Sequence, residues 1–230
     1  MSESPKVSVV IPVYNEKATI LEIIDKVRAT GLVSEIVVVD DGSTDGTREL
    51  LDTIKYPEVR VLKHEKNAGK GAAVKTGFAS VTGDIAIIQD ADLEYDPNDY
   101  KALITPIVEG RADVVYGTRY GGSARKVDSL CHYMINRFIT TFFNVLMNRH
   151  FTDMETCYKV FKTEVIKKIN IKSKRFGVDP ELTAKTAKMR CRVFEVPISY
   201  VARGYDEGKK IGWRDGIATL LHILRFRFFN

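Results

Sequence analysis

The 230-residue sequence has few cysteines and no long apolar segment. Cys131, Cys157 and Cys191 are widely spaced and include no C-x-x-C pair, which argues against a disulfide framework or a cysteine zinc site. No run of about eighteen apolar residues occurs, so we predict no membrane-spanning helix. Residues 1–6 are polar and lack the apolar centre of a signal peptide, so we expect a cytoplasmic protein, soluble or peripheral on a membrane.

Charge of one sign is only mildly in excess. The formal net charge is +5, with 44% hydrophobic and 28% charged residues, an ordinary balance for a globular protein. A small positive charge suits anionic partners such as nucleotides, lipid phosphates and acidic membrane surfaces. The sequence shows neither a basic stripe nor a base-stacking motif, so we expect no nucleic-acid partner.

The N-terminal half alternates between apolar runs and helical patterns. The runs are typical of strands buried on both faces of a parallel sheet, and they lie at 7–13, 35–40, 59–62, 85–88 and 114–116. The helical patterns between them lie at 18–30, 46–54, 69–81 and 98–109. This alternation predicts an α/β fold with a mostly parallel central sheet.

The C-terminal half has a different character. Residues 130–147 form an amphipathic helical pattern with Arg137 on its polar face, followed by a helix near 180–189 and a strand near 193–200. The tail at 216–229 is apolar and then basic and aromatic. We expect one domain over 1–230, with a first half at 6–120, a second at 121–213 and an amphipathic tail at 214–230.

Carboxylates gather where the predicted strands end. Ligands of parallel sheets bind beyond the carboxyl ends of the strands, where Asp90-Ala91-Asp92 follows the fourth run. If this segment continues the strand, both carboxylates face the same side and can approach one cation. Oxygen ligands favour Mg²⁺ or Mn²⁺, with Glu94 as a third ligand. The alternative is a polar turn that leads into the next helix.

Two further segments suit parts of a nucleotide. Asp41 follows the second run, where a carboxylate can accept hydrogen bonds from a base or ribose; the alternative is a helix cap built on Ser43 and Asp45. Residues 66–71 open a helix whose backbone N–H groups suit an anion, and Lys70 adds positive charge. Gly71 excludes a Walker A loop, and no G-x-G-x-x-G follows the first run; simple capping of the helix is the alternative.

Four ordered motifs resemble the family 2 glycosyltransferases, which have the Rossmann-like glycosyltransferase-A fold. They are Val-Val-Ile-Pro-Val-Tyr-Asn-Glu at 9–16, Val-Val-Asp-Asp-Gly-Ser-Thr-Asp-Gly-Thr at 38–47, Asn-Ala-Gly-Lys-Gly-Ala-Ala at 67–73 and Asp-Ala-Asp at 90–92. The segments 152–159 and 203–212 are similar to the polyprenyl-phosphate branch, which includes the dolichol-phosphate mannose synthases. Thr156-Cys157 departs from the branch, in which Ser-Gly is common.

The resemblance implies a set of donor-binding residues. Those that would hold the base and ribose are Pro12, Tyr14, Glu16 and Asp41. Those that would gather a Mg²⁺ or Mn²⁺ ion around the diphosphate are Asp90, Asp92 and Glu94. Basic residues that would bind the phosphates are Lys70, Arg203, Lys209 and Lys210.

The acceptor side is implied in the same way. Arg119 and Arg137 would bind an acceptor phosphate, and Asp153 would orient the acceptor or assist as a base. Because a phosphate acceptor is already anionic, it needs no strong general base. The implied reaction moves a hexose, of the mannose or glucose type, from a GDP- or UDP-linked donor to a polyprenyl phosphate, with inversion at the anomeric carbon.

The alternatives concern the acceptor and the apolar surface. A soluble family 2 enzyme with a non-lipid acceptor would share the same donor site. The amphipathic helix and tail suit the cytoplasmic face of a membrane, which a polyprenyl acceptor requires. Packing on the sheet or contact within a homo-oligomer are competing uses of the same apolar residues.

Overall fold

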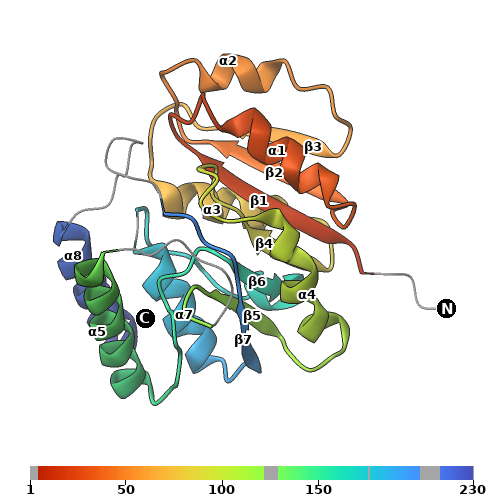
Figure 1. Ribbon diagram of the computed structural model, residues 1–230. Coiled ribbons are helices and arrows are strands. Elements are labelled where there is room, and N and C mark those ends of the chain that lie inside the picture. The colour runs from red at the N-terminus through yellow and green to blue at the C-terminus, as the bar shows by residue number, and fades with distance from the viewer. Residues whose placement is uncertain (1–4, 122–128, 176, 203–212, 230) are drawn as a thin grey trace.

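The computed structural model describes residues 5–121, 129–175, 177–202 and 213–229. These residues form a single α/β domain around a seven-stranded sheet (Figure 1). The strands are ordered β3-β2-β1-β4-β6-β5-β7. Their bounds are β1 Val7–Val13, β2 Glu35–Asp40, β3 Val59–Lys63, β4 Ile85–Ile88, β5 Val114–Thr118, β6 Lys159–Lys162 and β7 Val193–Pro197.

The sheet is parallel except at one strand. β1 pairs in parallel with β2 and β4, β2 pairs in parallel with β3, and β5 pairs in parallel with β7. β6 runs antiparallel between β4 and β5. All of β1 and β4 is buried, as expected for strands covered on both faces. The predicted α/β class and mostly parallel sheet are confirmed, whereas β6 was not predicted.

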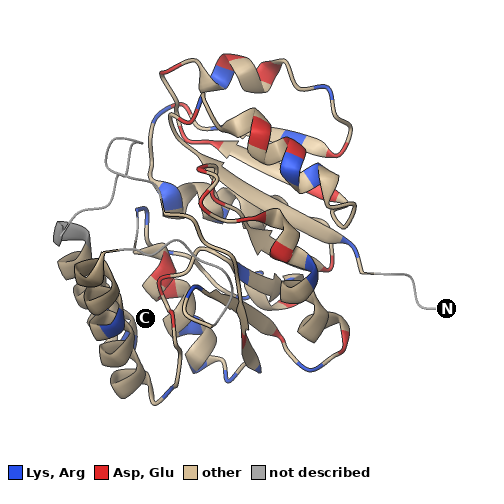
Figure 2. Ribbon diagram, viewed as in Figure 1, with Lys and Arg blue, Asp and Glu red and all other residues tan. Residues whose placement is uncertain are grey.

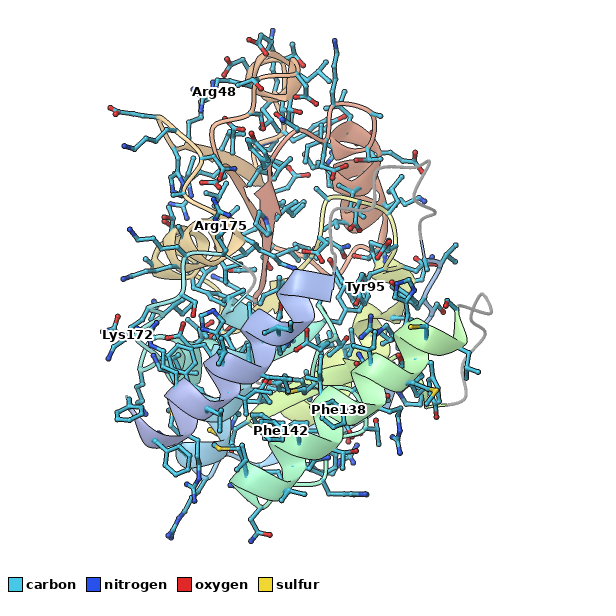
Figure 3. The ribbon with its side chains drawn as sticks, turned by 90° about the vertical axis from the view of Figure 1, so that its left-hand side faces the viewer. Arg48, Tyr95, Phe138, Phe142, Lys172 and Arg175 are labelled. Atoms are coloured by element: carbon cyan, nitrogen blue, oxygen red, sulfur yellow. The ribbon has the colours of Figure 1, made fainter. Side chains whose placement is uncertain are left out.

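The helices match the predicted patterns within a few residues, except α6, which was not predicted. Their bounds are α1 Ile20–Ala29, α2 Thr47–Asp52, α3 Lys70–Ser80, α4 Tyr100–Val108, α5 Leu130–Met147, α6 Thr163–Ile166, α7 Val178–Lys188 and α8 Trp213–Phe228. A short 3₁₀ turn, η1 Pro97–Asp99, precedes α4, and the Asp96 side chain caps it by accepting from Asn98 N. α5 and α8 lie side by side, and α7 packs on α8 (Figures 1 and 3).

The acidic segment forms a turn, which was the alternative to a continued strand. β4 ends at Ile88, and residues 91–94 form a turn in which Leu93 has a φ of 63°. Asp90 and Asp92 therefore do not continue the strand, and the alternation of faces along a strand does not fix where their carboxylates lie. They still lie at the carboxyl edge of the sheet, because the turn directly follows β4 between β1 and β6.

Candidate functional site

The loops after β1 and β2 are bonded to each other at the carboxyl edge of the sheet. Asn15 N donates to Ser43 Oγ at 3.0 Å, and Thr44 N donates to Asn15 Oδ1 at 2.8 Å. Glu16 N donates to Thr47 Oγ1 at 3.0 Å. These bonds hold two predicted nucleotide-binding segments in one place.

The four residues predicted to bind the base and ribose differ in exposure. Pro12 is buried in β1, Glu16 is partly buried, and the Tyr14 side chain on the loop after β1 is 37% exposed. Asp41, directly after β2, is only 2% exposed. Acidic and basic positions both occur on the loops at this edge (Figure 2).

Asp41 binds the start of α3. Asp41 Oδ1 accepts from Ala68 N at 3.0 Å and Oδ2 accepts from Gly69 N at 2.6 Å. Oδ1 also lies 2.7 Å from His64 Nδ1. The backbone N–H groups of Ala68 and Gly69, which were predicted to suit an anion, therefore bind the carboxylate of Asp41. Since each oxygen accepts about two hydrogen bonds, Oδ2 keeps one acceptor position beyond the bonds found among the described residues.

The start of α3 also packs closely against the backbone of residues 173–174. A Cβ on Gly71 would overlap the backbone carbonyl of Ser173, and a Cβ on Gly69 would overlap that of Lys174. Gly69 has a φ of 96°, a left-handed value that side chains disfavour. Glycine is therefore required at both positions, so simple capping of the helix does not account for them.

Lys70 brings α3 to the acidic turn. Its Nζ lies 2.8 Å from Asp90 Oδ1 and 3.0 Å from Oδ2, and each side chain is 19% exposed. Burial acts to raise the pKa of Asp90, but the charge and hydrogen bond of Lys70, with a hydrogen bond from Cys157 and the charge of Lys159, together hold that pKa below its usual value. The contact joins a predicted phosphate-binding lysine to a predicted metal ligand.

The other two acidic residues of the turn have separate partners. Asp92 Oδ1 accepts from Glu94 N at 3.2 Å, and Glu94 Oε2 accepts from Tyr200 Oη at 3.0 Å. No group of three His, Cys, Asp or Glu side chains within the described part of the chain is arranged to hold a metal. A three-carboxylate site is therefore not preformed there. Mg²⁺ commonly takes one or two carboxylates and completes its shell with water and substrate phosphates, so the oxygen donors of Asp90 and Asp92 fit such an ion.

Gln89 positions the turn and was not identified from the sequence. The side chain is fully buried, and its Nε2 donates to the Asp90 carbonyl at 3.0 Å. Its Oε1 accepts from Tyr100 Oη at 2.8 Å and from Tyr158 Oη at 2.7 Å. A polar residue at the end of an otherwise apolar strand was the only sequence signal for it.

Arg119 and Asp153 form a buried bidentate pair. Arg119 Nε donates to Asp153 Oδ2 at 2.7 Å and Nη2 donates to Oδ1 at 2.8 Å, with side-chain exposures of 14% and 0%. Burial acts to raise the pKa of Asp153, but Arg119 outweighs it and lowers that pKa. Asn136 on α5 donates to Oδ1 at 3.3 Å. A carboxylate held in this way is a poor proton acceptor and a good anchor for the guanidinium.

Of the remaining predicted residues, one lies on α5 and the others lie outside the described chain. Arg137 is exposed on α5. Arg203, Lys209 and Lys210 lie outside the described residues. The roles assigned to all the site residues stay predictions.

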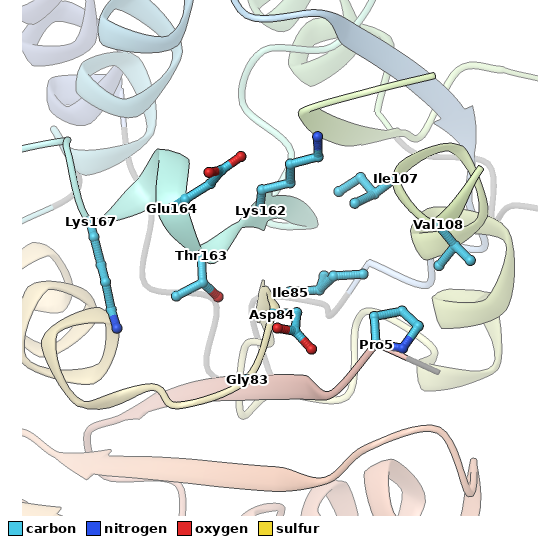
Figure 4. Close-up of a pocket in the computed structure, with 10 residues that line it drawn as sticks. All are labelled: Pro5, Gly83, Asp84, Ile85, Ile107, Val108, Lys162, Thr163, Glu164 and Lys167. Carbon is cyan, nitrogen blue, oxygen red and sulfur yellow. The ribbon is translucent and has the colours of Figure 1, made fainter. Parts of the chain in front are cut away.

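An open pocket of about 810 Å³ lies away from these residues (Figure 4). It is lined by the start of β4 and the end of the antiparallel β6, including Asp84, Lys162 and Lys167. It therefore opens at the amino edge of the sheet, opposite the acidic turn. Its charged groups are of both signs, and nothing in it continues the site above.

The chain is similar to known proteins over most of its length. The model of "Glycosyl transferase family 2" matches residues 8–169. A "Dolichol-phosphate mannosyltransferase" of Pyrococcus furiosus is 32% identical over 96% of this chain, which spans 63% of that protein. An "Undecaprenyl-phosphate mannosyltransferase" of Micrococcus luteus is 29% identical over 94% of this chain and 91% of its own length.

Solved structures agree on the fold. Glucosyl-3-phosphoglycerate synthase from Mycobacterium tuberculosis, crystallised with Mn²⁺, uridine diphosphate and phosphoglyceric acid, superposes with a TM-score of 0.76. The match covers 98% of this chain and 80% of that one at 22% identity. With the sheet described above, this establishes the glycosyltransferase-A fold. The chain belongs to glycosyltransferase family 2, and its curated relatives match the polyprenyl-phosphate branch of that family.

Proposed function

We propose that the protein transfers a hexose, of the mannose or glucose type, from a GDP- or UDP-linked donor to a polyprenyl phosphate. The observation that carries the proposal is the contact of Lys70 with Asp90 at the carboxyl edge of a glycosyltransferase-A sheet. The contact places the ammonium group of Lys70 beside the acidic turn, at the edge of the sheet where a nucleotide diphosphate binds in such folds. The two curated relatives named above, both polyprenyl-phosphate mannosyltransferases, support the lipid acceptor.

A divalent cation fits the acidic turn. Asp90 and Asp92 would supply one or two oxygen ligands, with Glu94 near them, and the donor phosphates would supply others. When bound, Mg²⁺ or Mn²⁺ would stabilise the charge that develops on the leaving diphosphate. Lys70 would contribute positive charge to the same phosphates, having exchanged its contact with Asp90 for one with the donor.

The state of Asp153 favours a phosphate acceptor. A hydroxyl acceptor must lose a proton as it attacks, whereas an acceptor phosphate oxygen is already charged. Asp153 is tied to Arg119 with a lowered pKa, so it orients the arginine rather than removing a proton. In the proposed step, a phosphate oxygen attacks the anomeric carbon. The bond to the diphosphate oxygen breaks, its electron pair leaves with the nucleotide diphosphate, and the configuration inverts.

The apolar surface of α5 and α8 suits a membrane. Four large side chains of α5 are highly exposed: Leu130, Met134, Phe138 and Val145. Leu221 and Phe228 of α8 and the following Phe229 are also exposed. Arg137, Arg225 and Arg227 are exposed on the same two helices, which suits anionic lipid. None of the helices in the described ranges is long and apolar enough to span a membrane.

Vesicle sedimentation tests this surface. We expect the protein to sediment with vesicles that contain anionic lipid, and Phe138→Ser together with Phe228→Ser to release it. Exchange of the exposed Leu32, which lies outside α5 and α8, for Ser is the matched control. Binding that the double variant retains would contradict the membrane role. A change in mass by light scattering instead would assign the surface to contact between copies of the chain.

A matrix of donors and acceptors tests the reaction. The donors are GDP-mannose, GDP-glucose, UDP-mannose and UDP-glucose, each with Mn²⁺ or Mg²⁺. The acceptors are a short polyprenyl phosphate and 3-phosphoglycerate. We expect transfer to the lipid phosphate only. Transfer to 3-phosphoglycerate would establish a soluble, non-lipid function, which the likeness to the mycobacterial synthase favours.

Metal dependence is tested at Asp92. Asp92→Ala is expected to lower the rate about 10²–10³-fold while leaving the melting temperature unchanged, because charge stabilisation at the leaving group is lost. Asp25→Ala, which removes an exposed carboxylate on α1, is the control. Full activity of the Asp92 variant, or of the wild type in excess chelator, would refute the metal role.

A further inference from the structure

Glu155 lies near two buried ion pairs. It belongs to the segment between α5 and β6 that also contains Asp153, the partner of Arg119. The second pair joins Lys159 of β6 and Asp179 of α7, whose Nζ and Oδ1 are 2.6 Å apart. The charges of Asp179, Lys159, Arg119 and Asp153 all act on the Glu155 carboxyl.

One carboxyl oxygen of Glu155 lacks a partner. Glu155 Oε1 is buried and has no hydrogen bond within the described ranges, although Glu155 as a residue is only partly buried. The adjacent Thr156 Oγ1 is buried and without a partner in the same way. Glu155 Oε1 and Thr156 Oγ1 are thus two unsatisfied polar atoms on neighbouring residues, of which Thr156 is fully buried and Glu155 only partly so. Buried polar atoms nearly always have a partner, so such a pair calls for a ligand.

The Glu155 carboxyl is poised near neutrality. Burial and the charge of Asp179 raise its pKa to about 7, against the lowering effect of Lys159 and Arg119. A purely structural role does not explain an acid here, since an amide of the same shape would avoid the cost of a buried ionisable group.

Glu155 lies on the segment that links the predicted acceptor side to the predicted donor side. Two residues before it, Asp153 holds Arg119, and two residues after it, the Cys157 side chain hydrogen-bonds to Asp90. Lys159, whose Nζ donates to the Thr156 carbonyl, also acts on the charge of Asp90. In an in-line attack, the transferred group lies between the leaving diphosphate and the attacking phosphate.

We propose that Glu155 binds a hydroxyl of the transferred hexose and thereby contributes to the choice of sugar. The inference rests on the proposed glycosyl transfer. A neutral carboxyl suits this place, because it accepts from a sugar hydroxyl through Oε1 and donates through its own O–H. A permanent negative charge there would instead repel two phosphate groups.

Kinetics with deoxy sugars test the proposal. Glu155→Ala is expected to lower kcat/KM about 10–100-fold for the full donor, because a hydroxyl contact is lost. Donors that lack one hydroxyl should be poor substrates for the wild type, and for one of them the Ala variant should show no additional loss. In calorimetry without acceptor, the affinity of the wild type for the nucleotide sugar should change near pH 7, and this change should be absent in Glu155→Gln. Glu164→Gln, at an exposed position, is the control.

Two outcomes would overturn the inference. One is an Ala variant that discriminates against every deoxy donor as strongly as the wild type does. The other is a change in affinity for the nucleotide sugar near pH 7 that persists in the Gln variant. Calorimetry separates these failures from failure of the proposed function. The nucleotide sugar and the bare nucleotide diphosphate are titrated into the wild type and the Ala variant.

The calorimetric titrations test the role of Glu155 even if no turnover is detected. We expect the sugar to improve affinity in the wild type and not in the Ala variant, with equal affinity of both proteins for the bare nucleotide. An equal gain from the sugar in both proteins would overturn the role of Glu155. A wild type that binds no nucleotide would overturn the proposed function, and the role of Glu155 with it.

Discussion

Removal of either side chain of the Arg119–Asp153 pair is predicted to cost much of the stability of the protein. The Asp153 carboxylate is fully buried, and it accepts from Nε, Nη2 and the backbone N of Arg119 at 2.7, 2.8 and 3.1 Å. Arg119→Ala leaves this carboxylate in the interior without its countercharge. Loss of one partner from such a pair costs about 3–5 kcal/mol. For a chain of this size, the melting temperature should fall by roughly 6–20 °C.

A double-mutant cycle measures the interaction itself. Urea unfolding, followed by circular dichroism, compares Arg119→Ala, Asp153→Ala and the double variant. The double variant should be more stable than the sum of the two losses predicts, by about 0.5–3 kcal/mol, because no unpaired charge remains in it. The exposed pair of Glu22 and Lys26 on α1 is the control, with an expected coupling of about 0.3–0.5 kcal/mol.

Additive losses at Arg119 and Asp153 would refute the reasoning, because they would show that the two charges do not compensate each other.

The same pair affects how an activity test is designed. Arg119→Lys keeps the positive charge but cannot make the bidentate contact. Acceptor kinetics of any Arg119 variant must therefore be measured at a temperature at which circular dichroism shows that it is folded.

Two further predictions concern stability. Gly71→Ala should destabilise the fold by about 1–3 kcal/mol in urea, because its Cβ would overlap the backbone carbonyl of Ser173, whereas Gly216→Ala in α8 should be neutral or stabilising; equal effects would contradict the close packing at α3. Glu155→Gln should be more stable than the wild type at pH 8 but not at pH 4. The pKa of Glu155 is about 7 in the folded protein and near 4.3 in the unfolded chain, so the stability of the wild type declines by about 3 kcal/mol as the pH rises from 4.3 to 7. If the stability difference between the Gln variant and the wild type is the same at pH 4 and pH 8, the Glu155 carboxyl is not buried.

Local patterns accounted for most of the elements, but not for β6. Its four residues, Lys-Val-Phe-Lys, are too few and too charged at the ends to resemble a buried strand. Lys159 is nevertheless fully buried, because Asp179 of α7 lies 2.6 Å from its Nζ. Because Asp179 belongs to a different element, the sequence around Lys159 does not show that this lysine has a countercharge. For the same reason, sequence motifs did not identify Gln89, whose partners are tyrosines of other segments.

The sequence by itself determined which side chains reach the carboxyl edge of the sheet, because strand period and length place the residues that follow each apolar run. Only the tertiary structure decided what those side chains contact. Lys70 meets Asp90 across 20 positions, Asp41 meets Ala68 across 27, and Arg119 meets Asp153 across 34. These pairings depend on the order of the strands and on the turn after β4, both of which follow from packing of the whole chain rather than from the residues near each motif.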